Sequence, residues 1–468
     1  MFKKKLSGWS EYRHYKCKTF APKNINELKY FIKKNKNVKK IVARGHGCSN
    51  GDQAVISNGI VIETFNLNEI INYNKKKKTI EVESGIKLSE ILAITLKDNL
   101  FFNCIPGGLD ITVGGAIANN VHGKDCFKNG YFNSNVKKIS ILLSNGKLIQ
   151  VSNKKNIELY ENIFSSLGLL GIIYSVELKL KNIKSPILEI ETKVAKNKYE
   201  MQEFFNNSKK YSDYLIAWLD CSSKNEGLLR GICMKSRFFE KKRINKIQSS
   251  EYLSKLNNFL EKRNKNKIRI FFYKSLWLII GIFFGSKFFY FFNFIVYNFY
   301  KILGQHKKNI LLIESILLHE KYLPEYNYIF KKNGFLTIQP FFNNEKPFDK
   351  IEQVILLCQK FNILPIWCPI KKYKNFNNKN FHFGGDGYSI VIEFSPQEIG
   401  IKKTEEFIYQ LENLIIKQKG KIYLAKDQII SKYAFQKFYP EYKKFLLLKK
   451  KYDKYNLFIS EQFNRLLT

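Results

Sequence analysis

Two glycine-rich segments hold the residue types best suited to bind a phosphate-containing ligand. The longer one, Pro106–Lys124, reads PGGLDITVGGAIANNVHGK and ends with His122 and Lys124. The other, Ala43–Asp52, reads ARGHGCSNGD and lies between two apolar runs. Glycine lets a ligand approach the main chain closely, and clustered backbone N–H groups form an anion-binding nest. The two segments together therefore predict a wrapper for a pyrophosphate.

The shorter segment comes close to a Rossmann fingerprint but does not fit one. Gly45-x-Gly47-x-x-Asn50-Gly51 approximates G-x-G-x-x-G after a strand-like run. The Rossmann motif needs a helix directly after the glycines, with its N-terminus toward the phosphates. Residues 52–59 lead into another strand-like run instead. The Rossmann interpretation is therefore excluded by context.

The elements that must position these segments predict an α+β fold, because short strands and helices alternate without a regular βαβ rhythm. Amphipathic helices are expected at 24–35 and 87–98. The strand-like runs lie at 40–43, 59–63, 79–84 and, as a hairpin turning at Asn145–Gly146, 137–151. From about residue 185 the β-rich pattern changes register, which indicates the start of a second domain.

The composition of the chain indicates how large its hydrophobic core can be and which kinds of binding partner its charge would favour. The chain has 468 residues, of which 45% are apolar and 15% aromatic, enough for a large core in two domains. The formal net charge is +39, but lysine is over-used along the whole chain, and lysine runs such as Lys75–Lys78 are typical of solvated turns. Nucleic-acid binding is not expected. A positive field would attract a phosphorylated substrate or acidic lipid headgroups.

Cysteines and the first residues indicate a cytoplasmic protein. The eight cysteines are scattered without C-x-x-C or paired histidine spacing, so reduced thiols are expected and a metal site is not. The segment MFKKKLSGW has a basic start without an apolar run, so it does not predict a signal peptide.

Residues 268–300 form an aromatic segment with three open interpretations. Its two apolar runs are each about a dozen residues long, short of the roughly 20 that span a bilayer, and Lys287 separates them. Tyr, Trp and Lys favour the membrane interface. The segment can be a buried core pair, a pair lying on the inner membrane surface, or a true span.

Six motifs, in order along the chain, resemble those of the vanillyl-alcohol-oxidase superfamily of flavoproteins, and most of all its sugar oxidases that act in epimerisation. They are LSGW at Leu6–Trp9, the two glycine segments, GLLGII at Gly168–Ile173, AWLD at Ala217–Asp220 and KIYLAKD at Lys421–Asp427. The resemblance implies a PCMH-type FAD-binding domain at 1–184, completed by 421–468. It also implies a substrate domain with a central antiparallel sheet at 185–420, with the aromatic insertion at about 235–310.

The resemblance implies an FAD-dependent oxidoreductase that oxidises a secondary hydroxyl of a sugar by hydride transfer to flavin N5. The implied substrate is linked to a polyprenyl phosphate, as in cell-wall or surface-polysaccharide synthesis, and the ketone would pass to a short-chain reductase partner. Two alternatives stay open. One is an aldonolactone or alditol oxidase, and the other is a non-catalytic scaffold in polysaccharide assembly.

The resemblance also assigns site residues. Lys426 is expected to place a cation near flavin N1 and C2=O, where it stabilises the charge that hydride arrival creates, and His122 to lie at the flavin edge. Substrate contacts are expected from Lys124, Gln339 and Lys371. The expected cofactor contacts are Ala43, Arg44, Gly45, His46, Gly47, Cys48, Ser49, Asn50, Gly51, Asp52, Gln53, Gly107, Thr112, Val113, Gly114, Gly115, Asn119, Asn120, Val121, His122, Ile173 and Tyr423.

Departures from the family pattern bear on cofactor attachment and on the substrate. Lactone oxidases of the superfamily carry a histidine bonded covalently to FAD where this chain has Cys48, so non-covalent FAD is expected. In the substrate half, Val391, Ser389 and Leu318, beside His319, replace a cysteine, an asparagine and a tyrosine of the similar sugar oxidases. The flavin half matches well and the substrate pocket does not.

Overall fold

The structure is a computed structural model. It describes residues 1–38, 40–183, 185–239, 267–283, 285, 287–312, 325–330, 334–365, 368–376 and 381–468. Helices are combined with largely antiparallel sheets, in agreement with the α+β class. The expected positions Leu318 and His319, and most of the polar part of the insertion at 235–268, lie outside the described residues.

The shorter glycine segment follows an edge strand of the first sheet. This sheet has the order β1-β2-β4-β3, with bounds β1 Phe2–Ser7, β2 His14–Phe20, β3 Ile41–Arg44 and β4 Ile60–Glu63. Helix α1 (Ile25–Lys34) joins β2 to β3, begins at the Asn24 cap and buries Leu28, Phe31 and Ile32. No helix lies between β3 and β4, as the exclusion of a Rossmann motif requires.

The longer glycine segment packs against the second sheet. The sheet order is β5-β6-β10-β8-β9, with bounds β5 Ile70–Asn74, β6 Thr79–Glu83, β10 Ile172–Lys179, β8 Val136–Leu142 and β9 Leu148–Ser152. The predicted hairpin is confirmed, and Gly146 turns it at φ +81°. The predicted helix at 87–98 is α2 (Leu88–Thr95) followed by a 3-10 turn.

Part of the longer glycine segment is helical, which its glycine-rich sequence did not predict. Residues Val113–Ala118 form helix α3, and the Thr112 hydroxyl caps it by accepting from the Gly115 N–H at 3.2 Å. Val113, Ala116 and Ile117 are buried in the core. A threonine cap and three buried apolar side chains are sufficient to make a helix of this short stretch.

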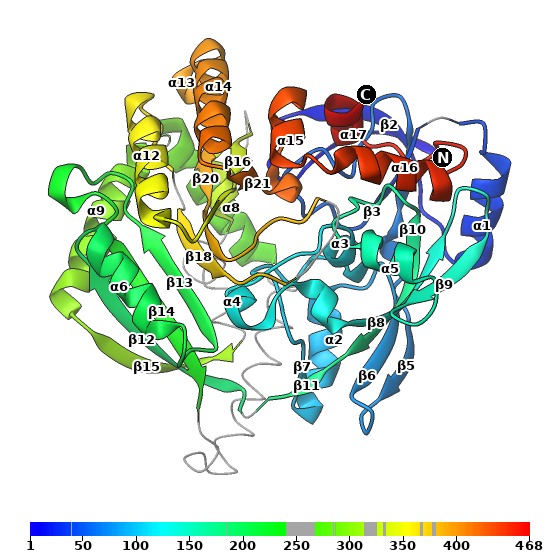
Figure 1. Ribbon diagram of the computed structural model, residues 1–468, viewed down its shortest axis with the longest axis horizontal. Helices are drawn as coiled ribbons and strands as arrows, with labels where there is room; N and C mark the ends of the chain where they lie inside the picture. The colour runs from blue at the N-terminus through cyan, green and yellow to red at the C-terminus, as the bar shows by residue number, and fades with distance from the viewer. Residues whose placement is uncertain are drawn as a thin grey trace.

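The third sheet dominates the other half of the molecule (Figure 1). Its order is β15-β12-β14-β13-β18-β19-β17-β21, and its pairs are antiparallel. The bounds are β12 Ile187–Ala195, β13 Tyr214–Leu219, β14 Gly231–Phe238, β15 His306–Leu311, β17 Pro340–Asn343, β18 Pro369–Tyr373, β19 Gly387–Ile390 and β21 Lys421–Ile422. Near it lie helices α6 (Lys198–Ser208), α12 (Pro347–Lys360) and α14 (Ile401–Lys417).

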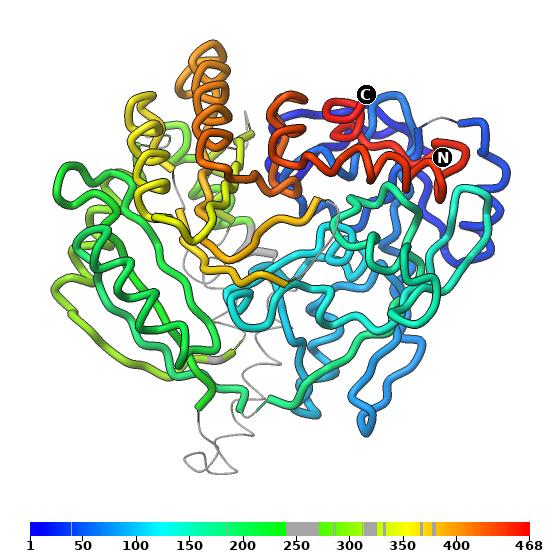
Figure 2. Tube along the Cα trace, in the orientation of Figure 1, coloured from blue at the N-terminus to red at the C-terminus, as the bar shows by residue number. Residues whose placement is uncertain are grey.

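The C-terminal segment returns to the first sheet. Figure 2 traces it from the third sheet back across the N-terminal half, as helices α15 (Lys432–Phe438), α16 (Tyr442–Tyr452) and α17 (Glu461–Leu467). Phe458 forms a parallel bridge with Ile41 of β3. The Arg465 guanidinium of α17 pairs with Asp52 at 2.9 Å and with Asp427 at 2.8 Å. The end of the chain is thus bonded to the shorter glycine segment.

The aromatic segment forms two helices that lie largely on the surface. They are α8 (Lys267–Phe283) and α9 (Lys287–Leu303). No described helix alone has the length and apolar composition to cross a membrane, whereas α8 and α9 together do, with a bend of 112° between them.

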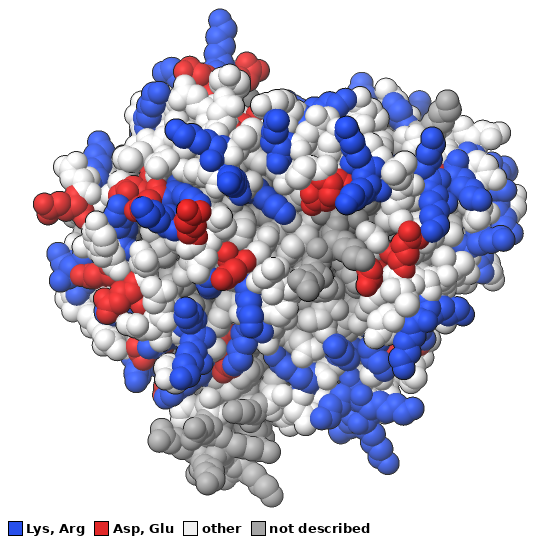
Figure 3. Space-filling view, viewed as in Figure 1, with Lys and Arg blue, Asp and Glu red and all other residues white. Residues whose placement is uncertain are grey.

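Basic side chains are numerous on the face of the molecule that Figure 3 shows. Figure 3 shows Lys and Arg scattered over the whole visible face, with acidic side chains interspersed. This distribution matches the chain-wide lysine bias noted in the sequence.

Candidate active site

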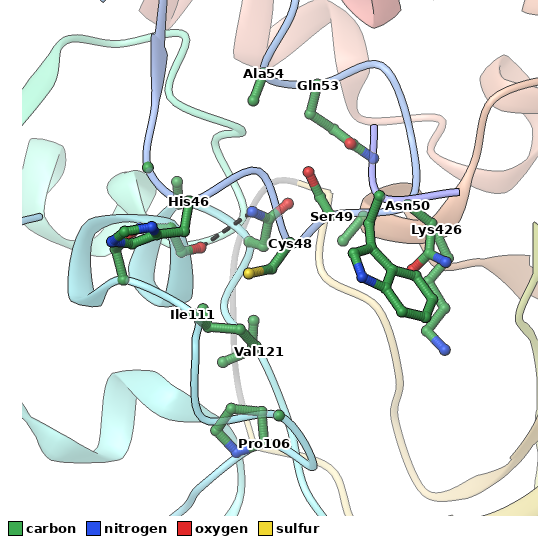
Figure 4. Close-up of a pocket in the computed structure, with 18 of the residues that line it drawn as sticks. His46, Cys48, Ser49, Asn50, Gln53, Ala54, Pro106, Ile111, Val121 and Lys426 are labelled. Atoms are coloured by element: carbon green, nitrogen blue, oxygen red, sulfur yellow. Dashed lines mark hydrogen bonds between the residues drawn. The ribbon is translucent and has the colours of Figure 1, made fainter. Parts of the chain in front are cut away.

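The two glycine segments, the third sheet and the 421–427 motif line one cavity of about 400 Å³. That volume lies within the range of small-molecule sites. Figure 4 shows Cys48 between His46 and Lys426, with its thiol directed toward Ile111 and Val121. Residues from sequence positions more than 370 apart therefore share one site, as the motif order implied.

The shorter segment is shaped by a close approach to the longer one. A Cβ atom at Gly45 would collide with Thr112 Oγ1, so only glycine fits there. The Cys48 thiol donates to the carbonyl oxygen of Asp110 at 3.5 Å, which joins the two segments again. Their backbones therefore form one continuous wall of the cavity.

Unsatisfied polar atoms show that the cavity wall suits a polar ligand such as FAD. Four buried side-chain atoms of cavity-lining residues have no partner within the described part of the chain: Gln53 Oε1, Ser84 Oγ, Asn119 Oδ1 and Gln339 Oε1. A buried polar atom without a partner costs about 1–3 kcal/mol. A ligand with hydrogen-bonding groups along both glycine segments would satisfy such atoms, so the residues present fit the cofactor that the motifs imply.

His122 lies at the centre of a polar and aromatic cluster. Tyr373 Oη is 3.2 Å from His122 Nδ1, and Gln339 Nε2 is 3.5 Å from His122 Nε2. Gln339 Nε2 also donates to Tyr373 Oη and to Ser389 Oγ, each at 3.0 Å. The rings of Phe383 and Tyr423 pack on the imidazole. These contacts fix the ring position from several separate segments of the chain at once.

Electrostatics keep His122 neutral. Burial lowers the pKa of His122 well below its ordinary value, and the charges of Lys371, Lys426 and His382 lower it further. A neutral imidazole can accept a hydrogen bond from a substrate hydroxyl. The cluster therefore presents an acceptor to the cavity at physiological pH.

Three lysines from separate elements face the same cavity. Burial is the largest cause that lowers the pKa of Lys124, Lys371 and Lys426, and the charge of Lys371 lowers the pKa of the other two. The pKa of Lys426 falls to about 8, although Glu393 opposes the shift. Burial and mutual repulsion disfavour the ammonium forms in the empty cavity, and a bound anion would favour them again, so the three lysines suit an anionic ligand.

Neighbouring lysines on β18 have different environments. Lys371 lines the cavity, whereas Lys372 pairs with Asp386 at 2.8 Å and lies 4.5 Å from the Tyr388 ring centroid. Alternate strand residues point to opposite faces of a sheet, which separates the two. Lys371, and not Lys372, is therefore the lysine of this pair that can contact a ligand.

Most residues expected at the site line the cavity. They are Ala43, Arg44, Gly45, His46, Gly47, Cys48, Ser49, Asn50, Gln53, Gly107, Thr112, Gly114, Gly115, Asn119, Val121, His122, Lys124, Ile173, Gln339, Lys371, Tyr423 and Lys426. The Tyr423 hydroxyl donates to the backbone oxygen of Asn119 at 3.1 Å, which bonds the 421–427 motif to the longer glycine segment.

Four expected cofactor residues do not line the cavity: Gly51, Asp52, Val113 and Asn120. Asp52 is buried and paired with Arg465, and a Cβ atom at Gly51 would collide with the Asp427 carbonyl oxygen. Val113 is in the core, and Asn120 Oδ1 accepts from the Asn133 N–H at 3.0 Å. The structure places them as supports of the glycine segments.

Several cavity-lining residues were missed by the sequence analysis. The chemically relevant ones are Trp9, Ser84, Ile216, Tyr326 and Glu393, whereas Val391, which the resemblance had placed in the substrate pocket, does line the cavity. Trp9 belongs to the LSGW motif and could have been included. Glu393 is buried and accepts from the Tyr326 hydroxyl at 2.8 Å. No local sequence pattern marks Glu393 or Tyr326, because the two residues come from separate elements that meet only in the folded chain.

Comparisons with known proteins bear on the cofactor and on the class of enzyme. An FAD binding domain model matches residues 18–152. Decaprenylphosphoryl-beta-D-ribose oxidase of Mycolicibacterium smegmatis is 23% identical over 431 residues, 91% of this chain and 89% of that protein. L-gulonolactone oxidase of Bos taurus is 28% identical over 182 residues, 37% of this chain and 40% of that protein. Cytokinin dehydrogenase 1 of Arabidopsis thaliana is 33% identical over 143 residues, 30% of this chain and 25% of that protein.

The glycine wall, the match to an FAD binding domain and these relatives define a flavoprotein with a PCMH-type FAD domain. The chain carries an FAD-binding domain of the kind that the resemblance to the vanillyl-alcohol-oxidase superfamily implied, and it is an FAD-dependent oxidoreductase acting on CH–OH groups.

Proposed function

We propose that the enzyme oxidises a secondary hydroxyl of a sugar linked to a polyprenyl phosphate, as the oxidase half of an epimerisation. The observation that carries the proposal is the set of three cavity lysines, Lys124, Lys371 and Lys426, which suits an anionic substrate. The relative that is similar over 91% of this chain is named for a decaprenylphosphoryl sugar. A short-chain reductase partner would reduce the ketone and complete the epimerisation.

The proposed domains follow the two sets of cavity residues. Residues 1–184 with 421–468 form the FAD-binding domain, which supplies both glycine segments and Lys426. Residues 185–420 form the substrate domain, which supplies Lys371 from its antiparallel sheet and Gln339 from the residue just before β17. The reacting groups would then meet at the boundary between the domains.

The proposed roles follow from charge and burial. When bound along the glycine segments, FAD supplies the acceptor for the substrate hydride. Lys124 and Lys371 hold the substrate phosphate as point charges. His122 accepts a hydrogen bond from the hydroxyl that is oxidised, and Tyr373 and Gln339 orient the imidazole. Lys426 provides a fixed cation where negative charge develops.

We expect FAD to be held without a covalent bond. Cys48 stands where lactone oxidases of the superfamily carry the attachment histidine, and its thiol is engaged with the Asp110 carbonyl. Acid precipitation of the purified protein should leave the yellow colour in the supernatant. Colour that stays in the pellet, and that follows a peptide containing His46 or Cys48 after proteolysis, would contradict this expectation.

The substrate class is tested by anaerobic stopped-flow reduction of the bound flavin. Three compounds are compared: a short-chain prenyl-phosphoryl pentose, an aldonolactone, and a neutral alkyl glycoside of the same pentose. We expect rapid bleaching with the first compound and at least about tenfold weaker apparent affinity for the neutral glycoside, because a charged hydrogen bond is worth about 1.5–3 kcal/mol.

Two other results would overturn the proposed substrate. Preferential bleaching by the aldonolactone would support the lactone-oxidase alternative, in line with the similarity to L-gulonolactone oxidase. A flavin that none of the sugars reduces would favour a non-catalytic scaffold.

A further inference from the structure

The two helices of the aromatic segment expose an unusual amount of apolar surface. We call α8 and α9, residues 267–303, the aromatic hairpin. Its most exposed large side chains are Phe271, Phe272, Ile282 and Phe283 of α8, and Phe291, Phe294, Phe299 and Ile302 of α9, each 56–89% exposed. Contiguous apolar patches on a soluble surface mark interaction sites.

Helix α9 is apolar on both of its faces. Phe289 and Tyr297 face inward and are at most 4% exposed, at the i, i+8 spacing of one stripe. Phe291, Phe294 and Phe299 lie on the opposite stripe and face outward. A helix in contact with water normally has a polar outer face. The outer stripe of α9 is therefore suited to contact with another apolar surface.

The aromatic hairpin is fixed to the protein rather than loosely attached. Trp277 of α8 stacks on Phe289 of α9 with ring centroids 6.2 Å apart. The guanidinium of Arg230, the residue just before β14, lies 4.2 Å from the Tyr297 ring centroid. A Cβ atom at Gly281 would collide with the Ile329 carbonyl oxygen, so α8 lies against the segment 326–330 at backbone distance. The exposed stripe is therefore held in one orientation.

Charge favours a lipid surface as the occupant of this stripe. Residues 267–303 contain no Asp or Glu, while Lys287 and Lys301 lie at the two ends of α9 and are exposed. Lysine beside exposed aromatic and aliphatic residues is the composition of helices that lie in an anionic membrane interface. A second copy of the chain fits less well, because two molecules of net charge +39 repel each other.

We propose that the aromatic hairpin docks the enzyme peripherally on an anionic lipid bilayer, with the outer stripe of α9 and the exposed apolar side chains of α8 in the interface. This docking proposal rests on the aromatic hairpin alone and does not depend on the proposed function.

The docked hairpin is also linked to the cavity wall. Helix α8 packs against the 3-10 helix η6 (Tyr326–Phe330), where the Lys274 ammonium lies 4.6 Å from the Tyr328 ring centroid. Tyr326 of the same turn lines the cavity and donates to Glu393. Docking would therefore place the substrate side of the cavity near the bilayer, where a lipid-linked sugar resides. This second step rests on the proposed function.

Vesicle co-sedimentation of the full-length, flavin-loaded protein tests the docking. Vesicles of phosphatidylcholine alone are compared with vesicles that also contain phosphatidylglycerol. We expect binding to the anionic vesicles, and a loss of about tenfold or more in the Phe291→Glu/Phe294→Glu variant, because each exposed phenylalanine contributes substantial apolar area. The Lys287→Glu/Lys301→Glu variant should lose the preference for anionic lipid.

The matched control substitutes apolar residues that are equally exposed elsewhere. Tyr199→Glu and Leu447→Glu, at positions 71% and 70% exposed, should bind vesicles as the wild type does. An unchanged flavin spectrum shows that each variant is folded. Three results would overturn the proposal: wild type that does not sediment with anionic vesicles, equal binding of the Phe291→Glu/Phe294→Glu variant, or a stable dimer without vesicles that this variant abolishes. Failure of alkaline carbonate to extract the protein from cell membranes would also overturn it, since that result indicates a span.

Docking and the proposed function fail in different ways. If docking is wrong and the function is right, short-chain prenyl-phosphoryl sugars still bleach the flavin although the protein does not bind vesicles. If the function is wrong and docking is right, the protein binds anionic vesicles but no prenyl-phosphoryl sugar reduces it.

Discussion

The Lys426→Ala variant should retain FAD and yet be reduced by substrate about 10²–10³-fold more slowly than the wild type, the usual effect of removing one well-placed electrostatic group. Both glycine segments stay intact in this variant, so the cofactor keeps its contacts. The reaction loses the cation that balances the negative charge of reduction. Anaerobic stopped-flow reduction against substrate concentration measures the limiting rate.

Two matched variants separate this role from simple substrate binding. Lys124→Ala should mainly weaken substrate affinity with a smaller effect on the limiting rate, because a ground-state contact contributes equally before and during the reaction. Lys426→Arg keeps the charge and should recover part of the rate. A Lys426→Ala enzyme that is reduced at the wild-type limiting rate would refute the proposed role and leave His122 as the central polar group.

The same lysine predicts the pH dependence of the reduction. Burial lowers the pKa of Lys426 to about 8, so its charged form predominates below that pH and is lost as the pH rises through it. An anionic ligand in the cavity raises this pKa and moves the loss to higher pH. The limiting rate of the wild type should therefore fall on the alkaline side, and Lys426→Arg should remove that fall, because arginine stays charged.

The Arg465→Ala variant should be destabilised by about 3–5 kcal/mol, the typical effect of breaking a buried ion pair from one side. Arg465 pairs with both Asp52 and Asp427, and each carboxylate side chain is 1% exposed. Without the guanidinium, two buried carboxylates next to the shorter glycine segment lose their counter-charge. Weakened FAD binding should accompany the loss of stability, although Arg465 does not line the cavity.

Urea unfolding with and without added FAD measures this effect. Arg237→Ala is the matched control, because Arg237 pairs with Glu189 at 2.8 Å but its side chain is 60% exposed. An exposed pair contributes only about 0–1 kcal/mol. Equal destabilisation by the two substitutions would show that the Arg465 pairs do not hold the C-terminal helix to the flavin wall.

The parts of the fold that were predictable have strong local signals. Asn24 caps α1, and Asn145–Gly146 turns the β8–β9 hairpin, so both elements follow from short-range chemistry. Helix α3 was not predicted, because its two glycines suggest a loop while its stability comes from the Thr112 cap and from burial of Val113 and Ile117. Burial is a property of the tertiary structure that periodicity over six residues does not reveal.

In the candidate site, too, the residues marked by local motifs were predictable and those that depend on tertiary contacts were not. The glycine segments, His122 and Lys426 could be selected because motifs mark them. Glu393 and Tyr326 could not, because they are separated in sequence and join only when η6 meets the strand β20 (Ile392–Phe394) in the folded chain. Asp52 was expected at the cofactor because it ends the glycine motif, but its partner is Arg465 near the end of the chain. Contacts over such separations depend on topology.

The most direct test of the account is the absorbance spectrum of the purified protein, followed by anaerobic addition of a prenyl-phosphoryl pentose. The cavity wall predicts a flavin spectrum with one FAD per chain, released by acid, and bleaching of the flavin in a single turnover. A colourless protein that takes up no added FAD would contradict the assignment of the cavity. A flavin spectrum that the pentose leaves unchanged, while an aldonolactone bleaches it, would contradict the proposed substrate.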